Sequence, residues 1–435
     1  MEEGARGIPT IMVAFGVTGD LMRLKVIPAL FALHAHGDLP EKFRLVGFSR
    51  RDWGDEEFRT YIRGVIIERV NDAKEVDVAT FLNLLHFQSG DFSNKESYVS
   101  LKHTVDALDA SWGVCTNKIF YFAVAPGFYR SIIEDMSLSG LSEGCSQEDG
   151  WTRIIIEKPF GHDGVEAERL EKLLATSFQE EQIYRIDHYL AKESLRTMLE
   201  SRLGGDFFGE TWSAENVESI TIRLLEDIGV EKRGGFYDTV GALRDVGQNH
   251  MLEILALLVM ERPAYRTAKA IREKRADALE ALEIIAHEDM STKTIRAQYD
   301  GYRDISGVAP DSITETYFKI RASLRSAHWL GVPIILEAGK RLGESRKEVV
   351  IHFKNGTDTV IRIGSENAVQ YSEEYKHLLL EAIRGDQTLF VSKREVEAMW
   401  RFADPIVRAW YEGTERVPLH TYQPDTSDIY TRAGW

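Results

Sequence analysis

Cysteine is scarce in this chain of 435 residues, which contains only Cys115 and Cys145. So few cysteines exclude a disulfide framework and a structural zinc site. The first residues, Met1–Gly4, also lack the basic and apolar regions of a secretory signal peptide. These absences favour the reducing cytosol, so we expect a cytoplasmic protein.

Long apolar runs and an excess of basic residues are also missing. The most apolar helical stretch, Met251–Met260, is interrupted by Glu253, and no run approaches the roughly 20 apolar residues of a membrane span. Lys and Arg number 53 against 69 Asp and Glu, a formal net charge of −16. Because this charge repels nucleic-acid backbones and anionic lipids, we expect neither as a partner. An anionic ligand must be bound by a local cluster of basic groups.

Apolar residues are plentiful, at 43%, and the length predicts roughly two or three domains. Up to residue 186, strand-like apolar runs alternate with stretches of helical periodicity, which predicts a parallel sheet with helices on both faces. The expected strands are Thr10–Phe15, Arg44–Phe48, Lys118–Val124, Thr152–Glu157 and Gln182–Ile186. We therefore expect an α/β nucleotide-binding domain over 1–186.

Beyond residue 186, strands follow one another without regular crossover helices, which predicts an α+β domain over 187–435 with a large, mainly antiparallel sheet. The expected strands are Val217–Leu225, Thr316–Ala322, Val332–Leu336, Glu348–Phe353 and Thr359–Ile363. The expected helices are Tyr189–Arg202, Leu243–Met260, Ala268–Ala281, Glu374–Ile383 and Glu395–Tyr411.

The first strand runs into a turn with Gly16 and Gly19 and then into a helix beginning near Leu21. Glycines allow a sharp turn, and a helix N-terminus offers free N–H groups to a pyrophosphate. Thr18 and Leu21 stand where the usual Gly-x-Gly-x-x-Gly motif has its second and third glycines. The turn alone is therefore equally consistent with a simple connection.

The second strand is followed by Arg50, where an NAD-binding fold has an acidic residue for the ribose 2′-hydroxyl. An arginine there suits the 2′-phosphate of NADP, although it could also be a solvated surface side chain. Asp91 and Phe92 follow the next strand-like run and could line the adenosine side of a cofactor, or simply form a turn.

Lys158 lies in the segment Glu157–Gly161, at the carboxyl end of a predicted parallel strand, where open α/β sheets bind their ligands. It could reach a cofactor phosphate or a substrate hydroxyl, or be an exposed turn lysine. Pro159, which follows it, is a candidate for a cis peptide bond.

A polar group follows the last strand of the first domain, where His188, Tyr189 and Lys192 are predicted to lie at a helix N-terminus. Imidazole, phenol and ammonium donors together suit a phosphate group. The alternative is a polar first turn that faces solvent.

Polar residues also enter the apolar helix after Gly234, among them Asp245 and His250. Buried polar groups need partners, which makes them candidates for a site, although a lone histidine is often a core residue. Asp245 and His250 are five residues apart, about 140° around an α-helix, so we do not expect them to pair. If His250 is a base, its carboxylate partner comes from elsewhere, and Asp187 is a candidate.

Six blocks extend in order over nearly the whole chain, and the most specific is Arg185–Leu190. They are Gly16–Leu21 with Lys25 and Pro28–Leu30, Glu157–Gly161, Arg185–Leu190 with Lys192–Glu193, Arg244–His250, Gly331–Leu342 and Gly385–Phe390. Together they resemble the glucose-6-phosphate dehydrogenase family. The resemblance implies a Rossmann-type NADP-binding domain followed by a substrate-binding and dimerisation domain. It also implies oxidation of glucose 6-phosphate to its lactone, the first step of the pentose phosphate pathway, without a metal.

The resemblance also implies roles for individual residues. His250 matches the general base for the C1 hydroxyl of the sugar, and Asp187 matches a carboxylate that could orient it. The implied phosphate ligands are His188, Tyr189, Lys192 and Lys340. The implied partners of the sugar hydroxyls are Glu226 and Asp245, with Lys158 between sugar and cofactor. The implied NADP contacts are Gly16, Thr18, Gly19 and Arg50, with Lys25 as a helper. We also expect Asp20, Leu21, Asp91, Phe92 and Lys158 in the cofactor site.

The chain departs from the family pattern at several positions. It has Ala191 where the family usually has Gly, and Glu337 where the family has Arg or a similar residue. Ala125–Pro126 replaces a Pro-Pro pair. The spacing between Lys340 and Arg346 differs from the family's by about one residue, so the resemblance does not assign Arg346 to the substrate.

The second domain is also shorter in the sheet region that carries the family's dimer contact, because Gly364–Ser365 replaces a Gln-Pro pair and Glu373 follows early. A homodimer and a homotetramer are both left open. Two other functions remain as alternatives: a dehydrogenase of another sugar phosphate that uses NADP or NAD, and a non-catalytic NADP-binding sensor.

Overall fold

The first sheet of the protein is built from the apolar runs of the N-terminal part of the chain. A computed structural model describes residues 7, 9–144, 150–205, 212–364, 368–412, 417–427 and 429. The strands of the sheet lie in the order β13-β6-β5-β4-β1-β2-β3. Their bounds are β1 Thr10–Phe15, β2 Phe43–Ser49, β3 Leu85–Ser89, β4 Asn117–Phe122, β5 Thr152–Glu157, β6 Ile183–Ile186 and β13 Phe390–Val391. All neighbouring pairs are parallel except β13 with β6, as expected for this domain.

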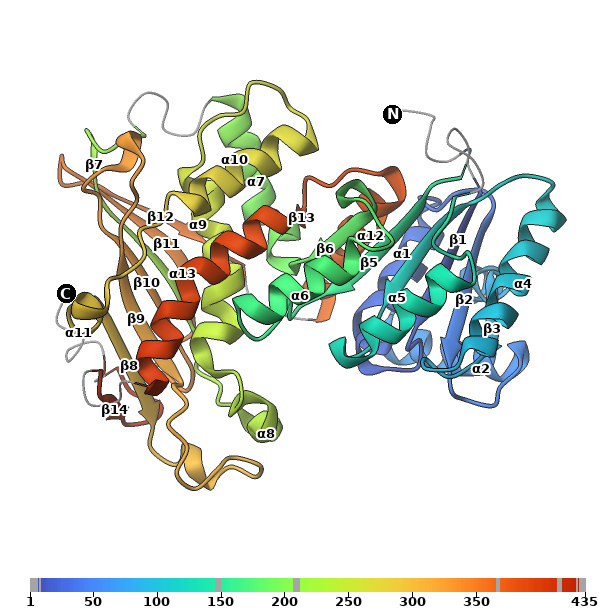
Figure 1. Cartoon of the computed structure of the whole chain (residues 1–435), viewed down its shortest axis with the longest axis horizontal. Coiled ribbons are helices and arrows are strands. Elements are labelled where there is room, and N and C mark those ends of the chain that lie inside the picture. Colours follow the sequence, from blue (N-terminus) through green and yellow to red (C-terminus); the bar gives the residue numbers. More distant parts are fainter. Residues whose placement is uncertain are drawn as a thin grey trace. The chain divides into compact units, whose positions relative to one another are not determined.

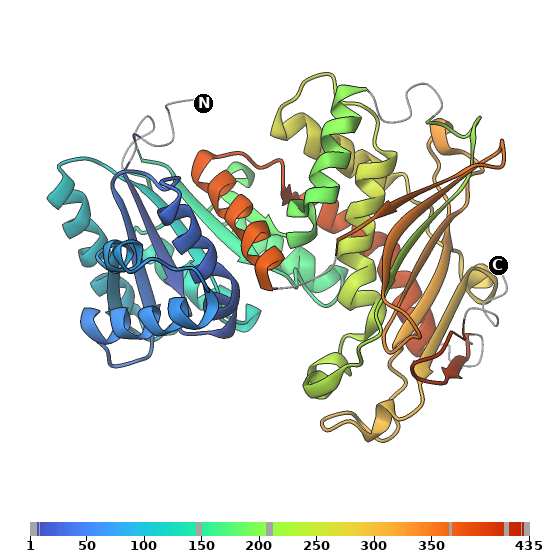
Figure 2. The ribbon, with the colours of Figure 1, turned by 180° about the vertical axis from the view of Figure 1, so that it is seen from behind.

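Helices cover both faces of this sheet, which explains why a strand such as β1 is buried along its whole length. The helix α1 packs against α2, α3 and α12, whereas α4 packs against α5. Figures 1 and 2 show the two sides of the sheet. The helix bounds are α1 Ile27–Ala35, α2 Asp55–Arg69, α3 Glu75–Leu82, α4 Lys95–Trp112, α5 Tyr129–Leu138, α6 Gly164–Leu174 and α12 Ala368–Arg384.

The second sheet has the strand order β12-β11-β7-β10-β9-β8-β14. Its bounds are β7 Val217–Leu225, β8 Thr294–Tyr299, β9 Tyr317–Ala322, β10 Ile334–Gly339, β11 Arg346–Phe353, β12 Asp358–Arg362 and β14 Leu419–Tyr422. The pairs β7–β10 and β8–β14 are parallel, and the other neighbouring pairs are antiparallel. The prediction of a mainly antiparallel sheet is therefore confirmed.

One face of the second sheet is covered by helices. A π-helical segment, Leu243–Met251, packs against β7 and β10, and α13 packs against this segment. Phe318 of β9 meets Trp410 of α13 with ring centroids 6.5 Å apart. We call this the inner face of the sheet. The helices of this part are α7 Glu193–Gly204, α8 Gly234–Tyr237, α9 Leu252–Val259, α10 Ala268–Glu280, α11 Met290–Lys293 and α13 Lys393–Glu412.

The chain divides into two compact units, and the first is discontinuous in sequence. It comprises Met1–Phe160, Arg169–Ala191 and Glu366–Val391, and the second comprises Gly161–Glu168, Lys192–Ser365 and Ser392–Trp435. A single boundary between residues 186 and 187 does not describe this division, because α12 and β13 return to the first unit.

The structure corrects several predicted elements. The helix expected over Tyr189–Arg202 begins only at Glu193, and the one expected over Leu243–Met260 is π-helical up to Met251. The strands β8 and β14 were not predicted. β14 pairs with β8, more than a hundred residues earlier in the chain, so no local pattern signals this pairing.

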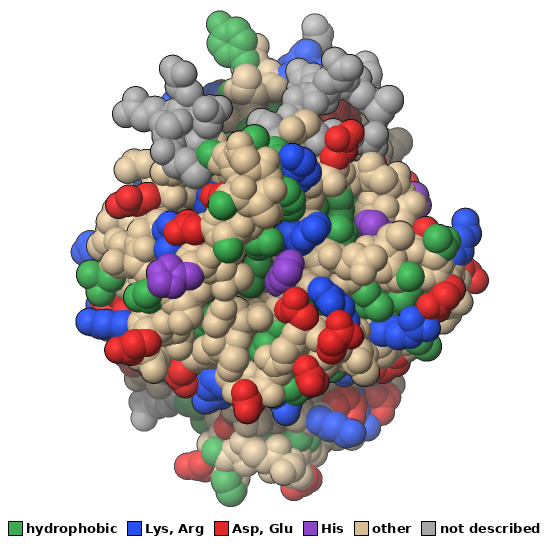
Figure 3. Space-filling model, turned by 90° about the vertical axis from the view of Figure 1, so that its right-hand side faces the viewer, with side chains coloured by type: hydrophobic (Ala, Val, Ile, Leu, Met, Phe, Trp, Pro, Cys, Tyr) green, Lys and Arg blue, Asp and Glu red, His purple; other side chains and the backbone are tan. Residues whose placement is uncertain are grey.

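Cys115 is disulfide-bonded, which the low number of cysteines did not predict; Cys145 lies outside the described residues. Within the described part of the chain, no helix has the length and apolarity that crossing a membrane requires. Acidic and basic side chains are interspersed on the face that Figure 3 shows.

A buried ion pair joins α10 and α13 in the second unit. Arg275 Nε lies 2.6 Å from Glu395 Oε1, and both side chains are completely buried. Glu395 also accepts a hydrogen bond of 2.6 Å from the Ser392 N–H. Breaking such a pair leaves an uncompensated charge in the interior.

We therefore expect Glu395→Ala to lower the free energy of unfolding by about 3–5 kcal/mol. The matched control is Glu397→Ala on the same helix, because its pair with Lys393 spans 3.7 Å between half-exposed side chains. Exposed pairs contribute at most about 1 kcal/mol. Urea denaturation measures both variants, and equal transition midpoints would contradict the prediction.

Candidate active site

The turn after β1 requires glycine at its first position. Gly16 has φ +79°, and a Cβ there would lie 2.4 Å from the carbonyl oxygen of Ala123. The Gly19 N–H donates to the Gly16 carbonyl over 2.9 Å, and the helix that follows begins at Asp20. The backbone therefore turns tightly onto a helix N-terminus at the carboxyl edge of a parallel sheet. A dinucleotide pyrophosphate fits this arrangement.

Arg50 is exposed directly after β2, the strand beside β1. The two strand ends are tied together, because the Gly16 N–H donates to the Phe48 carbonyl over 2.9 Å. Arg50 therefore lies at the same edge of the sheet as the glycine turn, where its guanidinium could bind a 2′-phosphate.

The turn after β3 holds the other predicted adenosine contacts. Asp91 is exposed and accepts a hydrogen bond of 2.8 Å from the Ser93 N–H. Phe92 is buried, and its ring lies 5.3 Å from Phe128 and 5.9 Å from Phe48. The Phe92 ring is therefore part of the core of the first unit.

Glu157, at the end of β5 and directly before Lys158, accepts hydrogen bonds from two tyrosine hydroxyls. The hydroxyls of Tyr121 and Tyr375 donate to the same oxygen of Glu157, over 2.5 and 3.1 Å. Burial raises the pKa of Glu157, and these hydrogen bonds and Lys25 oppose the rise. Lys158 is half-buried, and its peptide bond to Pro159 is cis.

Both tyrosines were missed by the sequence analysis. Tyr375 comes from α12, far along the chain, and no local pattern signals that this helix returns to the first sheet. Lys25, the expected helper, lies with its Nζ 5.3 Å from the centre of the Tyr375 ring.

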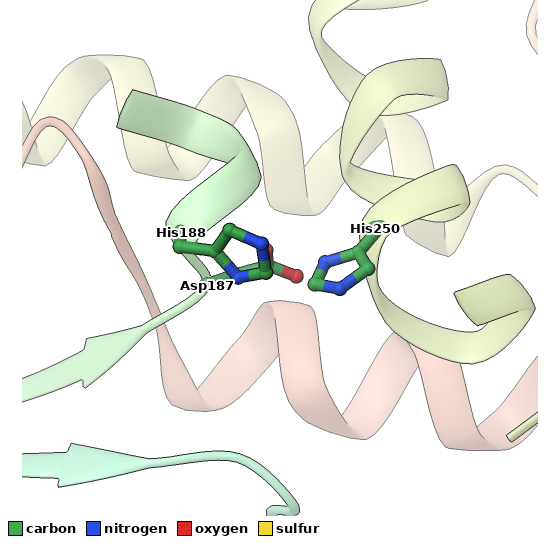
Figure 4. A group of neighbouring side chains, drawn as sticks. All are labelled: Asp187, His188 and His250. Carbon is green, nitrogen blue, oxygen red and sulfur yellow. The ribbon is translucent and has the colours of Figure 1, made fainter. Parts of the chain in front are cut away.

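The residues after β6 form a short 3₁₀ turn rather than an α-helix. Figure 4 shows Asp187 and His188 where the chain leaves the strand. Asp187 is buried, and its carboxylate accepts a hydrogen bond of 3.0 Å from the Tyr189 N–H. The rings of His188 and Tyr189 meet edge to face, 5.1 Å apart. Lys192 is fully buried with extended backbone, and α7 begins after it. Lys192 thus lies at a helix N-terminus as predicted, whereas His188 and Tyr189 lie in the preceding 3₁₀ turn, where the Asp187 side chain binds the Tyr189 N–H.

The strand β6 itself is anchored by charge. Arg185 is fully buried and pairs with Glu171 at 2.6 Å and with Glu180 at 2.9 Å. Two carboxylates on one guanidinium fix the strand immediately before Asp187.

In the second unit, Glu226, Asp245 and Lys340 lie together. Glu226 follows β7 and Lys340 follows β10, and because these strands are parallel neighbours their carboxyl ends meet. The Lys340 Nζ lies 2.5 Å from Glu226 Oε2 and 3.6 Å from Asp245 Oδ2. A further lysine, Lys347, lies 3.2 Å from Glu226 Oε1. Lys347 was not among the expected residues, because its contact with Glu226 depends on the register of β11 and not on a local pattern.

His250 lies on the π-helical segment and is buried (Figure 4). A π-helix joins residue i to residue i+5, so Asp245 and His250 lie about one turn apart. The expectation that they lie about 140° apart assumed α-helical geometry and is wrong.

The start of the π-helical segment is held by a buried carboxylate that the sequence analysis also missed. Glu315 accepts a hydrogen bond of 2.9 Å from the Leu243 N–H. Burial raises the pKa of Glu315, and this hydrogen bond opposes the rise. Nothing in the local sequence distinguishes Glu315 from an exposed glutamate.

Comparison with known proteins covers both units. The family model described as "Glucose-6-phosphate dehydrogenase, NAD binding domain" matches residues 13–196. The corresponding C-terminal domain model matches residues 199–368 and 357–432. The chain is 34% identical to glucose-6-phosphate 1-dehydrogenase 2 of Mycobacterium tuberculosis, covering 98% of this chain and 94% of the relative. It is 32% identical to the cytoplasmic glucose-6-phosphate 1-dehydrogenase 6 of Arabidopsis thaliana, covering 98% and 91%.

Solved structures of glucose-6-phosphate dehydrogenases are also similar to this chain over nearly its whole length. A glucose-6-phosphate dehydrogenase in complex with its substrate glucose-6-phosphate superposes with a TM-score of 0.87 at 30% identity, over 98% of this chain and 97% of that one. The enzyme from Mycobacterium avium gives a TM-score of 0.84 at 27% identity, with the same coverage. The chain belongs to the glucose-6-phosphate dehydrogenase family, with a nicotinamide-dinucleotide-binding Rossmann-type domain and an α+β C-terminal domain.

Proposed function

We propose that this protein oxidises D-glucose 6-phosphate at C1 to 6-phospho-D-glucono-1,5-lactone, the first step of the pentose phosphate pathway, with NADP as cofactor. The observation that carries the proposal is the charged cluster of Glu226, Asp245 and Lys340, on the helix-covered side of the second sheet. It combines hydroxyl acceptors with an ammonium group in a chain whose relatives are named for this reaction.

In the proposed mechanism, His250 is the general base. The imidazole takes the proton of the C1 hydroxyl, and Asp187 stabilises the resulting imidazolium and its tautomer. The Gly16–Gly19 turn and Arg50 would hold the dinucleotide, and its nicotinamide would supply the acceptor for the hydride of C1, so that the C1 carbonyl can form as the proton goes to His250. The burial of His250 excludes water from the proton transfer.

Other residues bind the two ends of the sugar phosphate. Glu226 and Asp245 accept hydrogen bonds from sugar hydroxyls, and Lys158 lies between sugar and cofactor. The proposed phosphate ligands are His188, Tyr189, Lys192 and Lys340. We also propose a cytoplasmic location. We further propose that the chain assembles as a homodimer or a homotetramer, and analytical ultracentrifugation measures this oligomeric state directly.

Replacing the proposed base tests the mechanism. We expect His250→Gln to lower kcat by about 10²- to 10⁴-fold, because it removes the group that accepts the proton. The dissociation constant for NADP should stay unchanged. The control is His352→Gln, an exposed histidine on β11 paired with Asp358 at 2.7 Å, which should retain the wild-type rate.

The same assay separates the alternatives. Wild-type protein with glucose 6-phosphate and NADP should produce reduced cofactor, seen as a rise in absorbance. If kcat/KM with galactose 6-phosphate or glucosamine 6-phosphate exceeds that with glucose 6-phosphate, the protein is better described as a dehydrogenase of another sugar phosphate. A wild type as inactive as His250→Gln, but still binding NADP, would favour the sensor.

Arg50 is proposed to select NADP over NAD. We expect Arg50→Gln to lower kcat/KM for NADP by roughly 10- to 100-fold, the effect of losing a hydrogen bond to a charged group. Activity with NAD should change little, since NAD lacks the 2′-phosphate. Arg63→Gln on α2, where Arg63 pairs with Glu75 at 2.8 Å, is the control. An equal loss with both cofactors would show that Arg50 has no part in selection.

A further inference from the structure

Tyr237, the last residue of α8, is a buried tyrosine whose hydroxyl has no hydrogen-bond partner among the residues that the structure describes. Its side chain is only 1% exposed. Buried tyrosine hydroxyls usually have a partner, because an unpaired one loses its hydrogen bonds to water without replacement. The hydroxyl of Tyr237 therefore lowers the stability of the free chain, and such a group calls for a functional explanation.

The backbone next to Tyr237 is firmly held, so the unpaired hydroxyl does not belong to a loosely placed residue. Asp238 accepts hydrogen bonds of 3.0 Å from the Tyr302 hydroxyl and of 3.0 Å from the Ala309 N–H. The rings of Tyr237 and Tyr302 meet edge to face, with their centroids 6.2 Å apart. Of these two neighbouring tyrosines, only Tyr302 donates to a carboxylate of the described chain.

Tyr237 lies beside the charged cluster that is proposed to bind the sugar. The Lys340 Nζ lies 5.4 Å from the centre of the Tyr237 ring, within the range of a cation–π contact. The same Nζ lies 3.6 Å from Asp245 Oδ2. Burial raises the pKa of Tyr237, and the charges of Asp245 and Glu315 raise it further, so the phenol stays protonated. Tyr237 is thus a buried donor next to a proposed acceptor of sugar hydroxyls.

We propose that Tyr237 is a further substrate-binding residue, whose hydroxyl donates a hydrogen bond to a sugar hydroxyl that Asp245 also binds. A sugar hydroxyl can donate to the carboxylate and accept from the phenol at the same time. The proposal rests on the proposed function and deepens it, because it adds a contact to the sugar ring rather than to the phosphate. The substrate then supplies the hydrogen-bond partner of a buried hydroxyl.

Tyr299 provides a matched control. It is buried in the same hydrophobic cluster as Tyr237, and the guanidinium carbon of Arg341, the residue after Lys340, lies 5.9 Å from the centre of its ring. Its hydroxyl differs in having a partner, because it accepts a hydrogen bond of 3.3 Å from the Val230 N–H. A change from tyrosine to phenylalanine therefore removes an unpaired hydroxyl at one position and a paired hydroxyl at the other.

We expect Tyr237→Phe to raise KM for glucose 6-phosphate by roughly 3- to 10-fold, the effect of losing one neutral hydrogen bond. Its KM for NADP should stay at the wild-type value. Without substrate, its Tm should equal or exceed that of the wild type, because the unpaired hydroxyl is gone. Tyr299→Phe should show the opposite pattern, a lower Tm with KM for glucose 6-phosphate within twofold of wild type. Steady-state kinetics and thermal unfolding measure both variants.

A tyrosine with a purely structural role would give a different result. A wild-type KM for glucose 6-phosphate in Tyr237→Phe would overturn the proposal. A lower Tm in Tyr237→Phe, or a KM that rises equally for NADP and glucose 6-phosphate, would also overturn it.

Thermal unfolding with glucose 6-phosphate in the absence of cofactor is independent of turnover. The sugar phosphate should raise the Tm of the wild type and of Tyr299→Phe, and raise that of Tyr237→Phe less at every concentration. If the wild type binds glucose 6-phosphate without oxidising it, the proposed function is wrong, and this comparison still decides the role of Tyr237. If glucose 6-phosphate leaves the Tm of the wild type unchanged, the assignment of Tyr237 is wrong as well.

Discussion

The parallel pairing of β7 with β10, within an otherwise mainly antiparallel sheet, is the constraint on which the second unit's part of the site depends. It brings the residues after both strands to one edge, where Glu226 and Lys340 form their ion pair. Because β11 runs antiparallel to β7, its first residues lie at the same edge and add Lys347. With antiparallel pairing throughout, the residues after β7 and β10 would lie at opposite ends of the sheet.

The face of the second sheet opposite the helices shows how a departure from the family pattern is accommodated. Glu337 stands where an arginine or similar residue is usual, and it is almost fully buried. It accepts hydrogen bonds from Arg223 at 3.1 Å and from the Tyr317 hydroxyl at 2.6 Å. Arg223 also pairs with Glu348 at 3.2 Å on its other side. The cation of Arg223 therefore lies between two anions on the adjacent strands, a favourable cross-strand arrangement in which Glu337 supplies one of the two anions.

Much of the first unit follows from the sequence, because fully apolar runs and a glycine that tolerates no side chain are local signals. Gly16 and the strand β1 are of this kind. Features set by distant contacts do not show in a local pattern. The return of α12 brings Tyr375 to Glu157, and the π-helical geometry of Leu243–Met251 changes which residues share a side of the helix. Lys347 is of the same type, since its contact with Glu226 follows only once the register of β11 is known.

An acidic protein that binds a dianion must keep its carboxylates from occupying the cations of the site. Glu157 directly precedes Lys158 and accepts hydrogen bonds from two tyrosine hydroxyls. Glu315 lies at the start of the π-helical segment and accepts a hydrogen bond from a backbone N–H. For both groups burial raises the pKa, which lowers the electrostatic cost of placing them near an anion. The carboxylate that does bind the lysines, Glu226, divides its two oxygens between Lys340 and Lys347. Asp245 also lies 3.6 Å from Lys340, so two ammonium groups face two carboxylates, and the charges of this cluster balance locally in a chain whose net charge is −16.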